Sequence, residues 1–176
     1  MQFFTATCLN WQNLLEPEEH KKIIMDSLQF MAVQKRIWLY GFVIMPNHIH
    51  LLWSQHDEYT GNIQQTFLKY TAQQIKFTLQ DKGDHEQLEK YRSTQQDREF
   101  HFWERRPFRA TMYNRKVAEQ KLDYIHYNPV KKGWCELPEH YTYSSAKYYI
   151  LNEDEWGILR ASIVRYELDA KDVSGR

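Results

Sequence analysis

The order of predicted elements indicates an α+β fold, in which a ferredoxin-like (split βαβ) antiparallel sheet carries two helices on one face. β-rich segments, stretches with apolar residues at helical spacing, and turn residues between them lead to this prediction. The expected order is strand, helix, strand, strand, helix, strand, with an additional helix on the C-terminal side. Strands are expected at residues 3–8, 37–45, 48–54 and 108–113, and helices at residues 17–36, 62–79 and 114–128.

The first half of the chain supplies a strand, a helix and a hairpin. Residues 3–8 read as a short strand, and Pro17 opens a helix because its fixed φ suits the first helical position. Ile24, Leu28 and Met31 then repeat at helical spacing. Pro46-Asn47 supplies a turn between two β-rich segments, which predicts a β-hairpin.

In the second half, one apolar stripe predicts a helix at residues 62–79. Residues 81–99 are polar without clean periodicity, and a loop or a ragged helix extension is expected there. Phe108, Ala110 and Met112 alternate with polar residues, as is typical of a half-buried strand. The third helix is expected to end near residue 128 because Pro129 makes continuation difficult.

Length and composition favour one domain, expected at residues 1–152, with a peripheral tail at 153–176. The apolar run at residues 38–45 is far shorter than the ~20 residues a membrane helix needs, and the N-terminus lacks the pattern of a signal peptide. Cys8 and Cys135 lie far apart without a CxxC spacing, which suggests a reducing compartment. We therefore expect a cytoplasmic protein with no membrane partner, and a monomer rather than a homodimer.

The formal net charge is zero, but the basic residues are unevenly placed. Residues 98–132 hold nine Lys and Arg against four Asp and Glu, a net charge of +5. Such a segment suits contact with phosphates, although charge alone fits a solvated surface equally well. The candidate DNA-binding residues are Arg105, Arg106, Arg109, Arg115, Lys121, Lys131 and Lys132.

A histidine pair and a tyrosine helix are the candidate chemical groups. His48 and His50 are two apart on a predicted strand, so their imidazoles point to one face and make half of a divalent-metal site. Leu52 stands where HxHxDH hydrolases need an acid. On the third helix, Tyr124 and Asn128 are four apart and about 40° from each other around the axis.

These groups suit one reaction when they are brought together. His48, His50 and the amide oxygen of Asn128 would hold a divalent cation, Mg²⁺ or Mn²⁺, with positions open for phosphate oxygens. A phenol has a pKa of ~10, so a nearby cation would help Tyr124 to act as a nucleophile. Attack on DNA would leave a covalent 5′-phosphotyrosine and a free 3′-hydroxyl. Tyr127, about 60° from Tyr124 around the same helix, is the rival nucleophile, although a half-exposed packing role is expected for it.

With these residues identified, the chain resembles the HUH single-strand DNA transposases, and among them the REP-associated tyrosine transposases. The matching motifs are Pro46-Asn47-His48-Ile49-His50 and Asp123-Tyr124-Ile125 with Asn128-Pro129-Val130, followed by Tyr143-Ser144-Ser145. The resemblance implies a ferredoxin-like core, His48, His50 and Asn128 as metal ligands, and Tyr124 as the nucleophile. It also implies single-stranded DNA or a DNA hairpin as the partner.

Two alternatives remain at this point. A non-catalytic single-stranded nucleic-acid-binding protein on an RRM-like scaffold would use the same sheet with exposed aromatic residues. A metal-dependent hydrolase that activates water would not need Tyr124. Within the resembled family, the sequence is equally compatible with a self-mobilising enzyme and a domesticated one.

Overall fold

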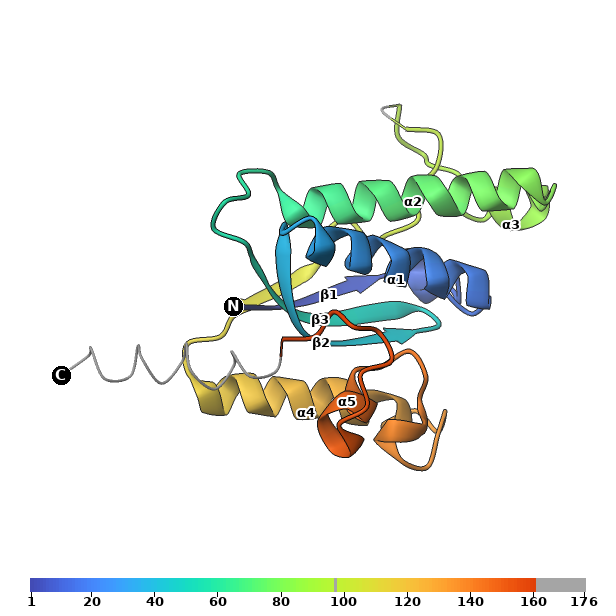
Figure 1. The fold of residues 1–176 in the computed structure, drawn as a ribbon. Coiled ribbons are helices and arrows are strands. Elements are labelled where there is room, and N and C mark those ends of the chain that lie inside the picture. Colours follow the sequence, from blue (N-terminus) through green and yellow to red (C-terminus); the bar gives the residue numbers. More distant parts are fainter. Residues whose placement is uncertain (97, 161–176) are drawn as a thin grey trace.

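The computed structural model describes residues 1–96 and 98–160 of the chain, and its fold is the predicted one. Strands β1 (Gln2–Thr7), β2 (Ile37–Met45), β3 (His48–Gln55) and β4 (Phe108–Thr111) form one sheet in the order β2-β3-β1-β4. All three neighbouring pairs are antiparallel. Figure 1 shows helices above and below this sheet. The α+β, ferredoxin-like prediction is therefore confirmed.

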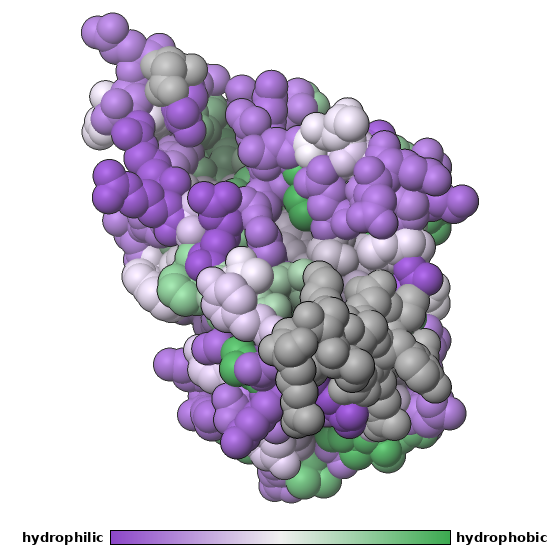
Figure 2. All heavy atoms as spheres, turned by 90° about the vertical axis from the view of Figure 1, so that its left-hand side faces the viewer, coloured by the Kyte–Doolittle hydropathy of each residue, from purple (hydrophilic) through white to green (hydrophobic). Residues whose placement is uncertain are grey.

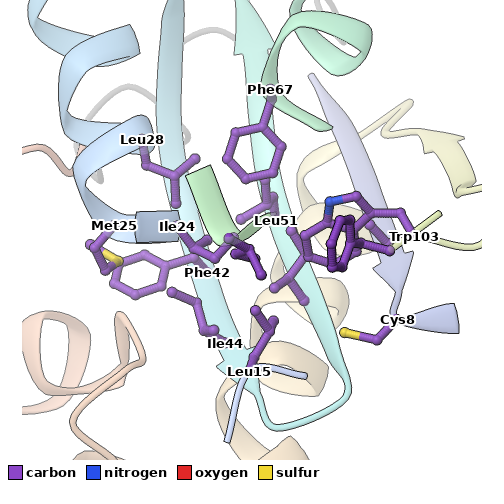
Figure 3. Close-up of a cluster of buried hydrophobic side chains, with 14 of the residues drawn as sticks. Cys8, Leu15, Ile24, Met25, Leu28, Phe42, Ile44, Leu51, Phe67 and Trp103 are labelled. Carbon is purple, nitrogen blue, oxygen red and sulfur yellow. The ribbon is translucent and has the colours of Figure 1, made fainter. Parts of the chain in front are cut away.

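Helices α1 (Glu18–Val33) and α2 (Ile63–Asp81) pack side by side on one face of the sheet (Figure 1). Their apolar stripes and the inward side chains of the strands form the larger buried cluster. Figure 3 shows Leu28 of α1, Phe67 of α2 and Leu51 of β3 within this layer, and all three are fully buried. The apolar spacing that predicted the two helices is the spacing that fills the core.

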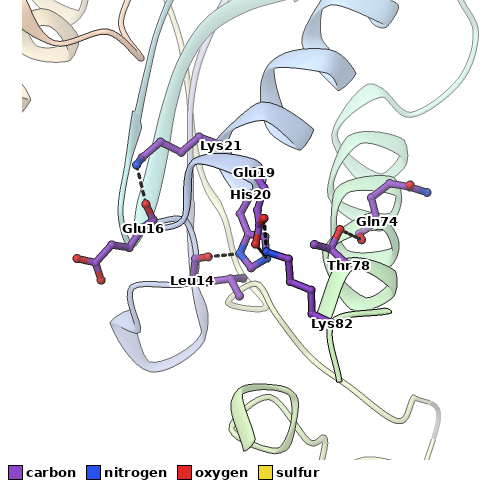
Figure 4. Close-up of polar contacts among 8 residues, drawn as sticks. All are labelled: Leu14, Glu16, Glu19, His20, Lys21, Gln74, Thr78 and Lys82. Atoms are coloured by element: carbon purple, nitrogen blue, oxygen red, sulfur yellow. Dashed lines mark hydrogen bonds and ion pairs between the residues drawn. The ribbon is translucent and has the colours of Figure 1, made fainter. Parts of the chain in front are cut away.

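Polar contacts hold the ends of these two helices in place (Figure 4). The His20 imidazole donates through Nδ1 to the Leu14 carbonyl over 2.6 Å, which anchors the loop ahead of α1. Lys82, just after α2, forms an ion pair with Glu19 in the first turn of α1. The start of one helix is thereby tied to the end of the other.

Helix α4 (Arg115–Lys131) covers the opposite face of the sheet, next to the 3-10 turn η2 (Pro138–His140) and the short helix α5 (Ala146–Leu151). Ala118, Leu122 and Ile125 of α4 are buried in a second cluster against the sheet, as the helical pattern predicted. Gly41 lies beneath α4, where an added Cβ would sit 2.4 Å from Leu122 Cδ1. The absence of a side chain at Gly41 allows α4 its close approach to β2.

We expect Gly41→Ala to destabilise the protein by about 1–3 kcal/mol, because the new methyl group overpacks the layer between β2 and α4. Chemical denaturation of the single variant measures the loss. Combining Gly41→Ala with Leu122→Ala should cost less than the sum of the two single changes, since Leu122 is the group that clashes. Strictly additive losses would show that the clash is not the cause.

Three local predictions were wrong in detail. Helix α4 runs through Pro129 to Lys131, because a proline in the last turn removes only one helical hydrogen bond. In β4, Phe108 is 58% exposed, because alternation puts a side chain on a face of the sheet without ensuring that another element covers it there. Within the expected loop or helix extension, Gly83 adopts a left-handed conformation that ends α2, and a separate short helix α3 (His85–Glu89) follows.

The segment after residue 152 lies against the body of the domain as far as the structure describes it. Leu159 forms a parallel bridge with Leu39 of β2, and Trp156 packs against the main core. The expected division at residue 152 stays a prediction, and residues 161–176 of the expected tail lie outside the described residues.

No helix in the described part of the chain has the length and apolar character to cross a membrane. The side of the molecule seen in Figure 2 is mostly hydrophilic, with apolar side chains in small separate patches. Cys8 and Cys135 are both free thiols.

Candidate active site

His48 and His50 lie on β3 with their rings side by side, 4.7 Å apart between centroids. Both are buried, at 5% exposure each. Ile49 and Leu51 point to the other face and belong to the core beneath α1 and α2. The alternation of the strand therefore puts both imidazoles on one face, as predicted, and in the structure this is the face that α4 covers.

Hydrogen bonds fix the tautomer of each imidazole. His48 Nδ1 lies 2.7 Å from Asn47 Oδ1, an acceptor, so this nitrogen carries the proton. Asn128 Nδ2, a donor, lies 3.3 Å from His50 Nε2. His50 Nδ1 therefore carries the proton and donates to Thr5 Oγ1 at 2.7 Å. Both Nε2 atoms are therefore unprotonated, the form that binds a metal, and the lone pair on His50 Nε2 accepts the hydrogen bond from Asn128 in this structure.

Burial keeps both rings neutral. Loss of hydration lowers the pKa of His48 to about 4, with the charge of Lys132 acting in the same direction and the nearby Asn128 amide opposing it. The pKa of His50 falls to about 3, first through burial and then through His48 and Lys121. A cation would therefore meet neutral imidazoles at physiological pH and displace no proton.

Asn128 brings an unsatisfied oxygen to the same place. Its side chain is buried between α4 and β3, and Oδ1 has no hydrogen-bond partner. An unpaired buried carbonyl costs about 1–3 kcal/mol and calls for an explanation. Coordination of a cation would supply one, because amide oxygens are ordinary ligands of hard cations. The two imidazoles and this amide fit the expected metal.

Carboxylates and thiols are not part of this arrangement. In residues 1–96 and 98–160, no three His, Cys, Asp or Glu side chains form a group that could hold a metal. The candidate metal ligands are His48, His50 and Asn128, and an asparagine is not one of those four residue types. Three protein ligands leave coordination positions for phosphate and water.

Tyr124 faces this group from α4. Its ring lies 5.1 Å from the His50 ring and 6.0 Å from Phe3 of β1. The side chain is 40% exposed, so the phenol reaches solvent while the ring stays packed. Lys121 and Lys131 place their Nζ atoms 5.6 and 5.7 Å from the Tyr124 ring. Tyr127 is 50% exposed and lines the same surface hollow of about 380 Å³.

The predicted DNA-binding residues divide into two groups. Lys121, Lys131 and Lys132 gather around Tyr124 and His48. The four arginines lie elsewhere: Arg115 pairs with Glu119 at 2.8 Å, and Arg109 donates to Gln64 of α2 at 2.9 Å, on the far side of the sheet. Arg105 and Arg106 are exposed in the segment before β4.

Some residues of this site were not among the predicted ones. Thr5 and Asn47 hold the imidazoles, and Phe3 supports the ring of Tyr124. Asn47 directly precedes His48, so its position in the turn was a usable signal. Thr5 and Phe3 lie on β1 opposite His50 and Leu52, and their role depends on a strand register that the sequence does not specify.

The fold that carries these residues is also found in a solved protein structure. No protein-family model matches the chain. A solved structure of a REP-associated tyrosine transposase bound to a REP hairpin shares the fold with a TM-score of 0.58. The match covers 91% of this chain and 82% of that one, at 18% sequence identity.

A relative in sequence agrees with it. The chain is 37% identical over 121 residues to a putative REP-associated tyrosine transposase from Haemophilus influenzae. The aligned part is 65% of this chain and 63% of the relative, so the match spans somewhat less than two thirds of that protein. The resemblance to the REP-associated tyrosine transposases that the motifs indicated is confirmed by the 37% identity to this relative. The solved structure, at 18% identity, confirms the fold.

Proposed function

We propose that the protein is a metal-dependent transposase that cuts and rejoins single-stranded DNA through Tyr124. The observation that carries the proposal is the meeting of two elements: β3 supplies two neutral imidazoles, and α4 supplies Asn128 and Tyr124 beside them. Neither motif alone has this chemistry. The similarity to REP-associated tyrosine transposases supports the same conclusion.

The reaction follows from the groups in place. A divalent cation, Mg²⁺ or Mn²⁺, held by His48, His50 and Asn128 would polarise the scissile phosphate. The Tyr124 oxygen attacks phosphorus, the bond to the 3′-oxygen breaks, and the phenolic proton ends on the released 3′-hydroxyl through solvent. The product is a 5′-phosphotyrosine. Attack by a 3′-hydroxyl on this ester reverses the step and rejoins the strand without ATP.

The lysines suit the charge of the substrate. Lys121, Lys131 and Lys132 lie around the reacting groups and would neutralise phosphates on either side of the scissile bond. The arginines lie away from Tyr124 and would contact phosphates farther from the scissile bond.

Cleavage of labelled oligonucleotides in Mn²⁺, and its loss in EDTA, tests the activity directly. Cleavage that is unchanged by EDTA would contradict the metal assignment.

We expect a DNA hairpin with a single-stranded flank to bind much more tightly than a matched duplex. The structurally similar transposase is bound to a REP hairpin, and Tyr124 lines an open hollow of the surface, whereas proteins that read duplex DNA usually insert a helix into the major groove. Competition titrations at two salt concentrations measure the preference. Affinity should fall only modestly with salt, because few lysines surround the site. Equal affinity for hairpin and duplex would contradict the proposed substrate.

The two alternative functions fit the structure less well. An RRM-like protein binds RNA on the open face of its sheet, whereas here α4 covers that face and buries Phe3, Tyr40 and Leu52. A hydrolase that activates water would have no use for a half-exposed tyrosine against His50. These observations favour the transposase.

A further inference from the structure

Two exposed tryptophans stand beside His48, and the reaction proposed above does not use them. Trp11 is 62% exposed and Trp134 is 50% exposed. Both line one small pocket of about 120 Å³, together with His48 and Lys132. A single exposed aromatic residue is ordinary. Two indoles around one pocket, next to a candidate metal ligand, indicate a binding surface.

Trp11 is held in position by its backbone. Asn10 and Trp11 both adopt left-handed conformations, with φ of 54° and 58°. Asparagine tolerates this region, but tryptophan rarely enters it, and such strain is concentrated at functional sites. Glu104 accepts a hydrogen bond from the Asn10 amide at 2.8 Å, and the Trp11 ring meets the His48 ring at 5.8 Å. The indole is therefore fixed against the candidate ligand.

Trp134 is held by the end of α4. Gly133 adopts a left-handed conformation with φ of 72°, and its amide donates to the Val130 carbonyl at 2.9 Å. The Trp134 amide donates to the Pro129 carbonyl at 3.0 Å. These two bonds form a Schellman motif, which turns the chain sharply after Lys132. The second indole is thus placed by a rigid cap and not by a loose loop.

We propose that this pocket holds one unpaired nucleobase next to the scissile phosphate, stacked on Trp11 and Trp134, with Lys132 neutralising the phosphate beside it. This inference rests on the proposed function and names a subsite of its substrate. Bases of any sequence stack on aromatic side chains, and indoles offer the largest surface for it. The pocket of about 120 Å³ is closer in size to one base than to a base pair, so it would favour an unpaired strand at the cleavage point.

The test is a binding cycle that combines protein and DNA changes. The whole chain carrying Tyr124→Phe keeps the DNA intact, and its affinity is measured for a hairpin whose unpaired flank has an abasic site at each position in turn. Trp11→Ala and Trp134→Ala are each added to this parent. Phe30→Ala, an exposed aromatic on α1 across the sheet from α4, is the control.

We expect each tryptophan variant to lose about tenfold in affinity for the intact hairpin, as for one lost stacking contact. One abasic position should cost the parent about the same, and the tryptophan variants should lose little more on that DNA. Trp11→Phe should keep most of the affinity. Phe30→Ala should behave as the parent throughout.

The subsite would be overturned if the affinity losses from the tryptophan substitution and from the abasic site were additive at every position. Unchanged affinity in both tryptophan variants would overturn it as well. The outcome is separate from that of the proposed reaction, because this cycle measures binding without cleavage. A covalent adduct on the unsubstituted chain without coupling at the tryptophans would reject the subsite and keep the function. Coupling without an adduct would keep the subsite and reject Tyr124 as nucleophile.

Discussion

Replacing Tyr124 with Phe is expected to abolish strand cleavage while the protein still folds and binds DNA. The change removes only the phenol oxygen, and the ring keeps its contacts with Phe3 and His50. Since the side chain is 40% exposed, the loss of stability should be small. Loss of the nucleophile in covalent catalysis lowers the rate by at least about a thousandfold. Cleavage of labelled single-stranded DNA, with thermal melting alongside, measures both effects.

Tyr127→Phe is the matched control for this variant. Tyr127 lies on the same helix, is 50% exposed and borders the same hollow. It should retain cleavage close to that of the unsubstituted chain. The reverse pattern, with activity lost in Tyr127→Phe and kept in Tyr124→Phe, would show that Tyr127 is the nucleophile and that the assignment to Tyr124 is wrong.

The second large effect is expected at the imidazoles. His48→Ala and His50→Ala should each lose metal-dependent cleavage, because each removes one of three proposed protein ligands. Even residues that only support metal ligands change affinity by about 10–100-fold when substituted, so a direct ligand should cost at least that much. Asn128→Ala should lose less, since water can replace an amide oxygen around a hard cation. Titration of cleavage with Mn²⁺ and calorimetric Mn²⁺ binding measure the losses.

His126→Gln separates metal binding from the removal of a buried histidine. His126 is also buried on α4, and its Nε2 contacts the Ser145 hydroxyl at 2.9 Å. Its substitution should lower stability and leave Mn²⁺ affinity unchanged. Equal Mn²⁺ affinity in His48→Ala, His50→Ala and the unsubstituted chain would show that these residues are not ligands.

Local rules explain why much of the fold was predictable. The turn at Pro46-Asn47 and the apolar stripes of α1 and α2 are short-range features, and the hairpin and the two helices that they define are present. Pro129 led to a helix end that was predicted too early, because the stability that a proline removes from a helix depends on how many helical residues follow it. Phe108 misled because alternation says which side chains share a face, but not whether another element covers that face.

The candidate site was likewise predictable in its short-range features and not in the packing of distant elements. The spacing of His48 and His50 on a strand, and of Tyr124 and Asn128 on a helix, is enough to put each pair on one face. That the two faces meet depends on how α4 crosses the sheet, and only the resemblance of the motifs pointed to it. The gathering of three lysines, but not the arginines, around Tyr124 and His48 was likewise beyond what charge counting can predict.

Capture of the covalent intermediate tests the proposed mechanism most directly. The protein is incubated with a 5′- or 3′-labelled hairpin carrying a single-stranded flank, in Mn²⁺ or in EDTA, and separated under denaturing conditions. We expect an SDS-stable adduct in Mn²⁺ alone, carrying the strand 3′ of the cut, and its nucleotide-bearing peptide should map to Tyr124. Cleavage without any adduct, or an adduct that maps to Tyr127 or persists in Tyr124→Phe, would contradict the mechanism.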